Sequence, residues 1–266
     1  MRRSRIVVTF VAALSTLTLV LGITSAQAAG ANYVSLGDSY SSGVGSGSYI
    51  SSSGSCLRST LAYSQLWANA HGPSSYRSVA CSGATTATVT SGQLSALTSS
   101  TTLVSISVGG NDVGFAKVMQ DCVLHGTDTC TSEINAAEAK ARSALPGLLG
   151  SLYSKIRSHS PGARVVVLSY PVFYHTGVWY CVGLSETSRK KINEGAGVLD
   201  SVIQAAAAAH GFAFADVRSR FAAGHQICDG SSSWLHNVDF DNLVQSYHPT
   251  AAGQSGGYLP AFSAAA

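Results

Sequence analysis

Four short polar turns in the sequence carry side chains suited to attack on an ester. They are residues 37–43 (GDSYSSG), 81–85 (CSGAT), 109–112 (GGND) and 246–250 (SYHPT). Ester hydrolysis needs a nucleophile, a general base and hydrogen-bond donors aimed at the oxyanion that develops. Ser39 can supply the nucleophile and His248 the base. The Gly83 N–H and the Asn111 side-chain amide can supply the donors.

Each turn has a plainer explanation when it is taken alone. Gly-Asp-Ser is a common turn, and Gly-Gly-Asn-Asp also suits a turn that begins a helix. A single histidine is more often a surface or capping residue than a catalytic base. The four turns together, placed at strand exits and ahead of the last expected helix, are hard to explain by turn chemistry, so we favour a hydrolytic site.

The rest of the sequence supplies elements that can bring these turns together. Short β-branched or aromatic runs are expected to form buried strands at residues 32–36, 75–80, 103–108, 164–168 and 212–216. Longer stretches, most of them Ala-rich, are expected to form helices at residues 63–71, 132–158, 185–210 and 250–262, the second continuing past Pro146. This alternation predicts one α/β domain with a parallel sheet covered on both faces. Ligands bind such sheets at the carboxyl ends of the strands, where the polar turns lie.

Motifs and composition exclude several other classes of protein. The sequence has no G-x-S-x-G, H-E-x-x-H, Walker A, G-x-G-x-x-G or C-x-x-C pattern, and no clustered carboxylates follow Asp38. We therefore expect neither a metal nor another cofactor. Charged residues make up only 11% of the 266 residues. Without the three arginines of the first five residues, basic and acidic residues balance, which argues against a nucleic-acid partner.

The N-terminus has the pattern of a secretory signal peptide. A basic start is followed by an apolar run over residues 6–23 and by Ala26-Gln27-Ala28, which predicts cleavage after Ala28. An uncleaved membrane anchor is the alternative, since the run nears the ~18 residues of a span. We expect residues 1–28 to be removed. Residues 29–266 are then expected to form one secreted, monomeric domain without stable membrane insertion.

The six cysteines of this mature chain agree with an oxidising compartment. They are Cys56, Cys81, Cys122, Cys130, Cys181 and Cys228. Six cysteines allow 15 pairings, and the sequence alone does not choose among them. Pairing of neighbours along the chain is preferred here because it gives three separate loops.

The four turns, in this order, resemble the SGNH (GDSL) hydrolase family, whose blocks centre on Ser, Gly, Asn and His. Within the family, the resemblance is to the extracellular lipases, esterases and phospholipases A1 of streptomycetes. It rests on residues 38–47, 81–84, 109–111, 234–236 and 246–259, and it extends over essentially the whole mature chain. It implies a flavodoxin-like three-layer α/β/α fold with a five-stranded parallel sheet.

The resemblance also implies a role for each residue of the site. Ser39 is the nucleophile, and His248 is the general base and then the general acid. The backbone N–H groups of Ser39 and Gly83 and the Asn111 side chain form the oxyanion hole. The cysteines pair in sequence, as Cys56–Cys81, Cys122–Cys130 and Cys181–Cys228.

One position departs from the family pattern. Much of the family has Asp three residues before the histidine, and this sequence has Gln245. An amide cannot supply the negative charge that stabilises imidazolium in a Ser-His-Asp triad. We therefore predict a Ser-His dyad in which a backbone carbonyl, that of Ser246 or Gln245, orients His248. Asp241 is the rival third member.

The other candidates are two aspartates with one expected role, and a histidine and an aromatic segment with two possible roles each. Asp38 and Asp112 are expected to fix turns as hydrogen-bond acceptors. His236 either lines the pocket or is a structural, hydrogen-bonded histidine. The aromatic residues of segment 170–180 either seat an acyl chain or belong to the core. No segment has the length and glycine hinges of a lid, so an open site is expected.

Together these observations predict a secreted carboxylic ester hydrolase that forms an acyl-enzyme. Lipid esters, meaning acylglycerols and phospholipids, are the expected substrates, with lipase and phospholipase A1 activity. A carbohydrate or cell-wall acetylesterase on the same fold is the first alternative. A non-catalytic secreted binding protein is the second. The sequence does not rank acyl-chain lengths.

Overall fold

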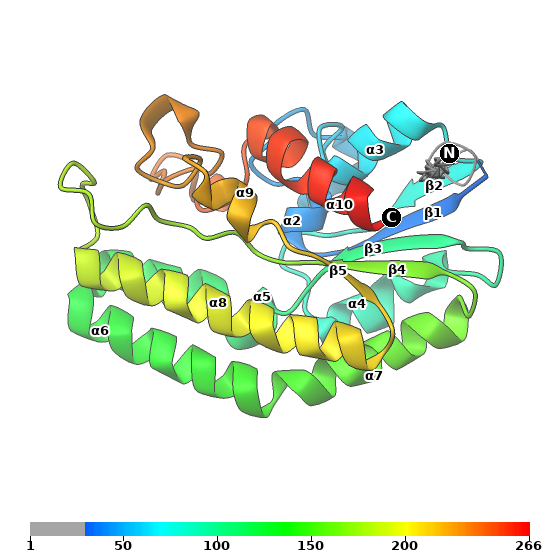
Figure 1. Ribbon diagram of the computed structural model, residues 1–266, viewed down its shortest axis with the longest axis horizontal. Helices are drawn as coiled ribbons and strands as arrows, with labels where there is room; N and C mark the ends of the chain where they lie inside the picture. The colour runs from blue at the N-terminus through cyan, green and yellow to red at the C-terminus, as the bar shows by residue number, and fades with distance from the viewer. Residues whose placement is uncertain (1–29) are drawn as a thin grey trace, which may run out of the picture.

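A computed structural model describes residues 30–266, and the expected signal peptide lies outside them. Its sheet has five parallel strands in the order β2-β1-β3-β4-β5 (Figure 1). They are β1 (Asn32–Gly37), β2 (Ser75–Ser78), β3 (Leu103–Ser107), β4 (Arg164–Leu168) and β5 (Ala213–Ala215). The expected five-stranded parallel sheet is confirmed, with strand ends that differ by no more than two residues from those expected.

The strand order places a topological switch point between β1 and β3, where the connections leave in opposite directions. Gly37 at the end of β1 is in register with Ser107 at the end of β3. The turns that follow these strands carry Ser39 and Asn111. Ligands bind open α/β sheets at such switch points, so the fold brings the two turns to the expected place.

Helices cover both faces of the sheet and form a three-layer α/β/α sandwich (Figure 1). One layer contains α2 (Ser39–Ser42), α3 (Tyr63–His71), α9 (Arg218–Ala222) and α10 (Leu259–Ala265). The opposite layer contains α4 (Thr86–Gly92), α5 (Gly110–Val113), α6 (Phe115–Ser143), α7 (Leu145–His159) and α8 (Glu186–Ala209). Short 3-10 turns lie at Ser51–Cys56, Leu94–Ala96, Gly230–Ser232 and Leu243–Gln245. The expected fold class is therefore correct.

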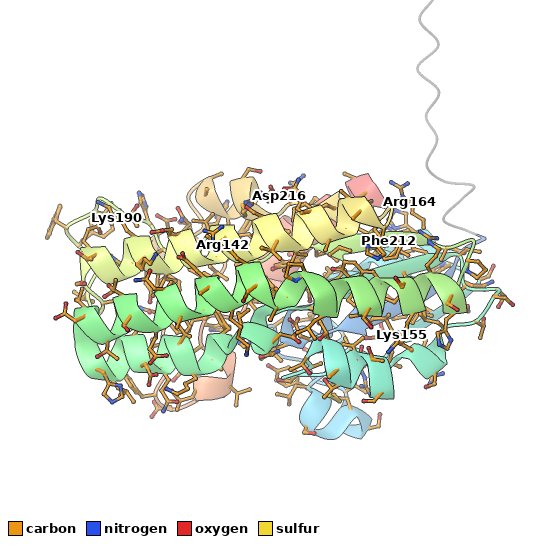
Figure 2. All side chains as sticks on the ribbon, turned by 90° about the horizontal axis from the view of Figure 1, so that it is seen from below. Arg142, Lys155, Arg164, Lys190, Phe212 and Asp216 are labelled. Carbon is orange, nitrogen blue, oxygen red and sulfur yellow. A yellow bond between two sulfur atoms is a disulfide. The ribbon has the colours of Figure 1, made fainter. Side chains whose placement is uncertain are left out.

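The prediction of a single helix over residues 132–158 is wrong. The structure has two helices there: α6 ends at Ser143, α7 begins at Leu145, and Pro146 lies in the first turn of α7. Proline lacks the N–H that a helix interior needs, but it is tolerated in the first turn of a helix, where that N–H has no partner within the helix. The first helix, α6, also begins much earlier, at Phe115. It reverses at Gly126, whose φ is +78°, so that it forms two arms. Figure 2 shows the longer arm beside α8.

The helix expected over residues 250–262 is also interrupted. A π-helical turn, Gly253–Tyr258, precedes α10. Its glycines lie against aromatic residues: a Cβ on Gly257 would lie 2.5 Å from the Phe221 ring, and one on Gly256 would lie 2.7 Å from the Trp234 ring. The close approach of the backbone to these rings requires glycine, and glycine stabilises regular helix poorly.

Three disulfides stabilise the connections in the described part of the chain. They are Cys56–Cys81, Cys122–Cys130 and Cys181–Cys228, which is the pairing of neighbours. Cys122–Cys130 links the two arms of α6 across Gly126. None of the helices within residues 30–266 is long and apolar enough to cross a membrane.

Candidate active site

Ser39 is presented at the first position of α2, directly after β1. The Asp38 side chain accepts a hydrogen bond from the Tyr40 N–H and so caps this short helix. Gly37 has a φ of +120°, and a Cβ there would lie 2.4 Å from the Ser107 carbonyl oxygen. Only glycine fits this close approach of β1 to β3. The Gly-Asp-Ser sequence is therefore a consequence of the sharp strand-to-helix turn.

His248 faces Ser39 from a segment far along the chain. Its Nε2 lies 2.7 Å from Ser39 Oγ, and its Nδ1 lies 3.0 Å from the Ser246 carbonyl oxygen. A carbonyl oxygen only accepts, so Nδ1 carries the proton and the Nε2 lone pair faces the Ser39 hydroxyl. This tautomer is the one that a general base for Ser39 needs.

Tyr247 holds the histidine segment in place. Its φ of +65° is uncommon for a residue other than glycine. The Tyr40 hydroxyl donates to the Tyr247 carbonyl at 2.9 Å, and the Tyr174 hydroxyl donates to the Tyr247 hydroxyl at 3.1 Å. The Tyr40 ring also packs against His248, with centroids 5.1 Å apart. These contacts compensate for the backbone strain and fix the direction of the imidazole.

The structure does not bring either alternative third member to His248. The Gln245 amide donates instead to the Asp239 carboxylate at 2.6 Å. Asp241 is exposed, and in the described structure its carboxylate makes no hydrogen bond with His248. Of the two carbonyls considered from the sequence, the one on Nδ1 is that of Ser246.

Burial sets the charge state of the histidine. It lowers the pKa of His248 from 6.5 to about 4, because a charged imidazolium loses its hydration there, while the Ser246 carbonyl opposes the shift. The imidazole is therefore neutral at pH 7. A neutral imidazole with a free Nε2 lone pair is ready to accept the Ser39 proton.

The expected oxyanion donors lie around the same cavity as Ser39. Gly83 has a φ of +77° in the turn after Cys81. Within the part of the chain that the structure describes, the N–H groups of Ser39 and Gly83 have no hydrogen-bond partner. The Asn111 amide donates one of its two N–H bonds to the Ala84 carbonyl at 3.0 Å, which leaves the second for a ligand.

Asp112 links the two turns that carry these donors. Its carboxylate accepts from the Thr86 N–H at 3.0 Å and from the Thr86 hydroxyl at 2.6 Å. Thr86 begins α4, directly after the Gly83 turn. Together with the bond from Asn111 to Ala84, these contacts hold the β2 and β3 turns in a fixed relative position.

Asp38 ties three strand ends together. Besides the Tyr40 N–H, its carboxylate accepts from the Ser107 hydroxyl at 2.6 Å and from the Tyr170 hydroxyl at 2.5 Å. The Tyr170 hydroxyl in turn accepts from the Gly110 N–H at 3.0 Å. Burial raises the pKa of Asp38 to about 6, although these hydrogen bonds act in the opposite direction. Asp38 and Asp112 thus have the roles of acceptors expected from the sequence.

The site opens into a cavity of about 460 Å³ whose walls are largely apolar. They include Phe115, Met119, Val123, Leu124, Val238, Phe240, Leu243 and Val244. Sequence reasoning missed the wall formed by α6, because it began that helix at Ser132. The three- and four-residue steps between Phe115, Val118, Met119 and Cys122 are the signal that could have revealed it.

The remaining candidates are His236 and the aromatic residues of segment 170–180, and most of them lie outside the cavity lining. His236 is outside the cavity lining, and its Nε2 bonds the Gly45 carbonyl at 2.7 Å. Of the 170–180 aromatics, Tyr170 lines the cavity, Phe173 and Tyr174 are buried in the core, and Trp179 is exposed. Within residues 30–266, no group of three or more His, Cys, Asp or Glu side chains is placed to hold a metal ion.

Comparison with known proteins gives consistent matches. The family model described as the GDSL-like Lipase/Acylhydrolase family matches residues 35–255. Lipase 1 of Streptomyces coelicolor is 57% identical over 243 residues, which cover 91% of this chain and 90% of that protein. A lipase of Streptomyces rimosus is 49% identical over 270 residues, with both chains covered completely.

Two crystal structures have the same fold. Phospholipase A1 from Streptomyces albidoflavus NA297 superposes with a TM-score of 0.86 at 52% identity, covering 90% of this chain and 100% of that one. The extracellular lipase from Streptomyces rimosus superposes with a TM-score of 0.85 at 51% identity, covering 88% of this chain and 99% of that one.

Proposed function

The chain belongs to the GDSL-like lipase/acylhydrolase family and is an ester hydrolase, and we propose that it acts on lipid esters through a Ser39–His248 dyad. The observation that carries this proposal is the pair of contacts on His248. Nε2 is 2.7 Å from Ser39 Oγ, and Nδ1 is held by the Ser246 carbonyl. A backbone carbonyl here takes the place of the carboxylate in a Ser-His-Asp triad.

The proposed reaction proceeds through an acyl-enzyme. His248 Nε2 takes the hydroxyl proton as Ser39 Oγ attacks the ester carbonyl carbon. The N–H groups of Ser39 and Gly83 and the free N–H of Asn111 stabilise the oxyanion. The intermediate collapses with cleavage of the ester C–O bond, and the leaving alcohol takes the proton from His248. Water then attacks the acyl carbon and gives a proton to His248 Nε2. The bond between the acyl carbon and Ser39 Oγ breaks, Oγ takes the proton back from His248, and the acid leaves.

Acylglycerols and phospholipids are the proposed substrates. The apolar cavity wall supports this choice, because an acyl chain gains free energy by burial against Phe115, Met119 and Leu124. The relatives are named lipase and phospholipase A1. An acetylated carbohydrate would need polar groups around the acyl carbon and gains nothing from a wall of this kind.

A series of p-nitrophenyl esters, from acetate to palmitate, tests the substrate class. The rate is expected to rise from acetate towards medium and long chains, and the purified protein is expected to release fatty acid from phosphatidylcholine. Ser39→Ala protein run in parallel gives the background rate. A rate confined to acetate would contradict the lipid assignment and leave the Ser39–His248 chemistry in place.

Secretion is part of the same proposal. The three disulfides and the signal pattern of residues 1–28 support it, and one relative is named an extracellular lipase. Sequencing the N-terminus of protein collected from the medium is expected to begin at Ala29. A protein that keeps residues 1–28 and stays with the cells would contradict this.

Acidification is expected to reduce activity through Asp38 before it protonates His248. Asp38 accepts three hydrogen bonds as a carboxylate, and its pKa is raised to about 6, so protonation near that pH removes acceptor capacity between the strand ends. The pKa of His248, lowered to about 4, would place its own effect about two pH units lower. We expect kcat/KM to fall as the pH drops through about 6.

The Asp38→Asn variant separates the two groups. It cannot titrate at position 38, so the acid limb of its pH–rate profile is expected to move towards pH 4, at a lower plateau rate. Initial rates on a soluble ester between pH 4 and 8 measure this. An unchanged midpoint in the variant would assign the limb to another group.

A further inference from the structure

Large apolar side chains are exposed around the mouth of the Ser39 cavity. Leu124 projects from α6, and Phe240, Leu243 and Val244 come from the segment before His248. The Phe240 side chain has 72% of its surface exposed. All four also line the cavity. We call these four residues the mouth patch.

A second exposed apolar group lies in the loop between β4 and α8. Trp179 is 94% exposed and Val182 is 82% exposed, with Tyr180 beside them. The Cys181–Cys228 disulfide anchors this Trp179 loop, which comprises residues 179–182.

The Trp179 loop and the mouth patch belong to the same end of the molecule. Ser185, which caps α8 just after the loop, bonds the Thr127 hydroxyl at 2.7 Å, and Thr127 lies three residues after Leu124. Figure 1 shows the β4–α8 connection and the reversal of α6 together at the end towards which the strands point. The Trp179 loop is therefore held near the turn of α6 that follows Leu124, while residues 179–182 themselves lie outside the cavity lining.

Such exposure indicates contact with an apolar phase. Tryptophan is highly buried on average, and contiguous exposed apolar side chains mark interaction sites. Trp and Tyr in particular concentrate at the boundary between lipid and water, where the ring is buried and the N–H or O–H stays hydrated. A disulfide-anchored loop loses little conformational entropy when it inserts.

The charges near the mouth patch favour an uncharged or zwitterionic lipid surface. Residues 237–246 contain Asp239 and Asp241 and no Lys or Arg. On the facing arm of α6, the one lysine, Lys117, is paired with Asp121. Anionic lipids attract clusters of Lys and Arg, and neither of these two segments carries one. Near the Trp179 loop, Arg189 and Lys190 are both paired with Glu186.

We propose that the mouth patch and the Trp179 loop dock the protein on a zwitterionic phospholipid surface, with the Ser39 cavity opening towards the lipid. The proposal rests on the proposed function, since a lipid ester must reach Ser39 from that surface. It adds that binding to the aggregate is separate from binding of one acyl chain in the cavity. A second copy of the chain on the same patch is the competing occupant.

Binding of the full mature chain to lipid vesicles tests the proposal without hydrolysis. Ser39→Ala protein is sedimented with phosphatidylcholine vesicles, alone and after further substitution by Trp179→Ser or Leu124→Asp. Leu148→Asp is the matched control, because Leu148 is an exposed helical leucine on α7, outside the cavity lining. Light scattering gives the oligomeric state of every variant, and circular dichroism checks folding.

The Trp179→Ser and Leu124→Asp substitutions are each expected to weaken vesicle binding about tenfold, the loss from one buried apolar side chain. Leu148→Asp is expected to bind like the parent. Vesicles that contain phosphatidylglycerol are expected to bind more weakly at low salt than phosphatidylcholine alone, and added salt is expected to remove the difference.

Four outcomes would overturn the proposal, three of them seen in the binding and light-scattering measurements. The first is equal binding by the mouth-patch, loop and control variants. The second is tighter binding to the anionic vesicles. The third is a dimer in solution that Leu124→Asp dissociates, with no vesicle binding, which would assign the patch to a second copy. Hydrolysis of soluble p-nitrophenyl esters by the unsubstituted protein is measured separately. Its presence beside absent vesicle binding would refute the docking surface alone.

Discussion

Replacing Ser39 by alanine is expected to lower kcat on p-nitrophenyl esters by about 10⁶-fold, the loss seen when a serine nucleophile is removed. No other hydroxyl is bonded to His248 Nε2 in the described structure, so no neighbour can take over the attack. The oxyanion donors remain, and they account for the small residual rate above uncatalysed hydrolysis.

The same variant also tests whether Ser39 is the nucleophile that would carry the acyl group. An organophosphate such as diisopropyl fluorophosphate is expected to add its phosphoryl group to the parent protein, as a mass increase on the peptide that contains Ser39. Ser39→Ala is expected to remain unmodified, and the exposed serine variant Ser91→Ala, on α4, is expected to react like the parent. Labelling of Ser39→Ala, or retention of the parent rate, would place the nucleophile elsewhere.

The His248→Ala variant, alone and combined with Ser39→Ala, tests whether the two residues act together. If Ser39 and His248 act as one unit, the double variant is expected to be no slower than the slower of the two single variants. Losses that multiply would show that the two residues act independently, in spite of the 2.7 Å contact between them.

Replacing Asn111 by alanine is expected to lower kcat by about 10²–10³-fold with little change in KM. In the proposed mechanism, the Asn111 N–H that is not bonded to Ala84 stabilises charge that exists only in the transition state, so its loss is expected to affect kcat rather than substrate binding. Steady-state rates on a soluble ester, with the thermal unfolding midpoint as a check of the fold, measure the effect.

Asn111→Asp sharpens this test. A carboxylate has nearly the shape of the amide, yet it cannot donate to the Ala84 carbonyl and would repel the oxyanion. We expect kcat to fall further than in Asn111→Ala at pH 7. A rise in KM with kcat preserved in either variant would instead assign Asn111 a role in holding the substrate.

In the proposed Ser39–His248 dyad, the position and burial of His248 take the place of a triad carboxylate. The Ser246 carbonyl fixes the tautomer of His248, and Tyr40 and Tyr247 fix its direction. The carboxylates that are buried near the nucleophile act on the scaffold. Asp38 joins the ends of β1, β3 and β4, and Asp112 joins the turns that carry Gly83 and Asn111. These carboxylates hold the turns that carry the proposed oxyanion donors. Donors that are positioned in advance need no rearrangement as charge develops.

The sequence by itself determined the sheet and the order of the chemical groups. Each strand is a short apolar run whose pattern is local, and β4 begins and ends where that pattern predicted. The turns containing Ser39, Gly83 and Asn111 follow strands, and parallel strands must end at one edge. Their convergence therefore follows from topology and does not depend on individual contacts.

Helix limits were less predictable, because the signals that set them are weaker than the contacts they compete with. The apolar stripe of residues 132–158 continues past Pro146, although the structure has two helices there. The arm of α6 that begins at Phe115 is stabilised by packing and by the Cys122–Cys130 disulfide, so its only local signal is the apolar spacing from Phe115 to Cys122.

Only the tertiary structure decided which partner each polar group takes and which apolar residues stay exposed. Ser246 rather than Asp241 lies on His248 because Tyr247, at a φ of +65°, turns the chain back on itself. Tyr170 reaches Asp38 across 132 residues, a pairing that no sequence spacing encodes. From the sequence, Trp179 could either seat an acyl chain or belong to the core, and nothing indicated where Phe240 lies. Their exposure depends on how the segments that carry them pack against the rest of the fold, and local sequence does not specify such long-range contacts.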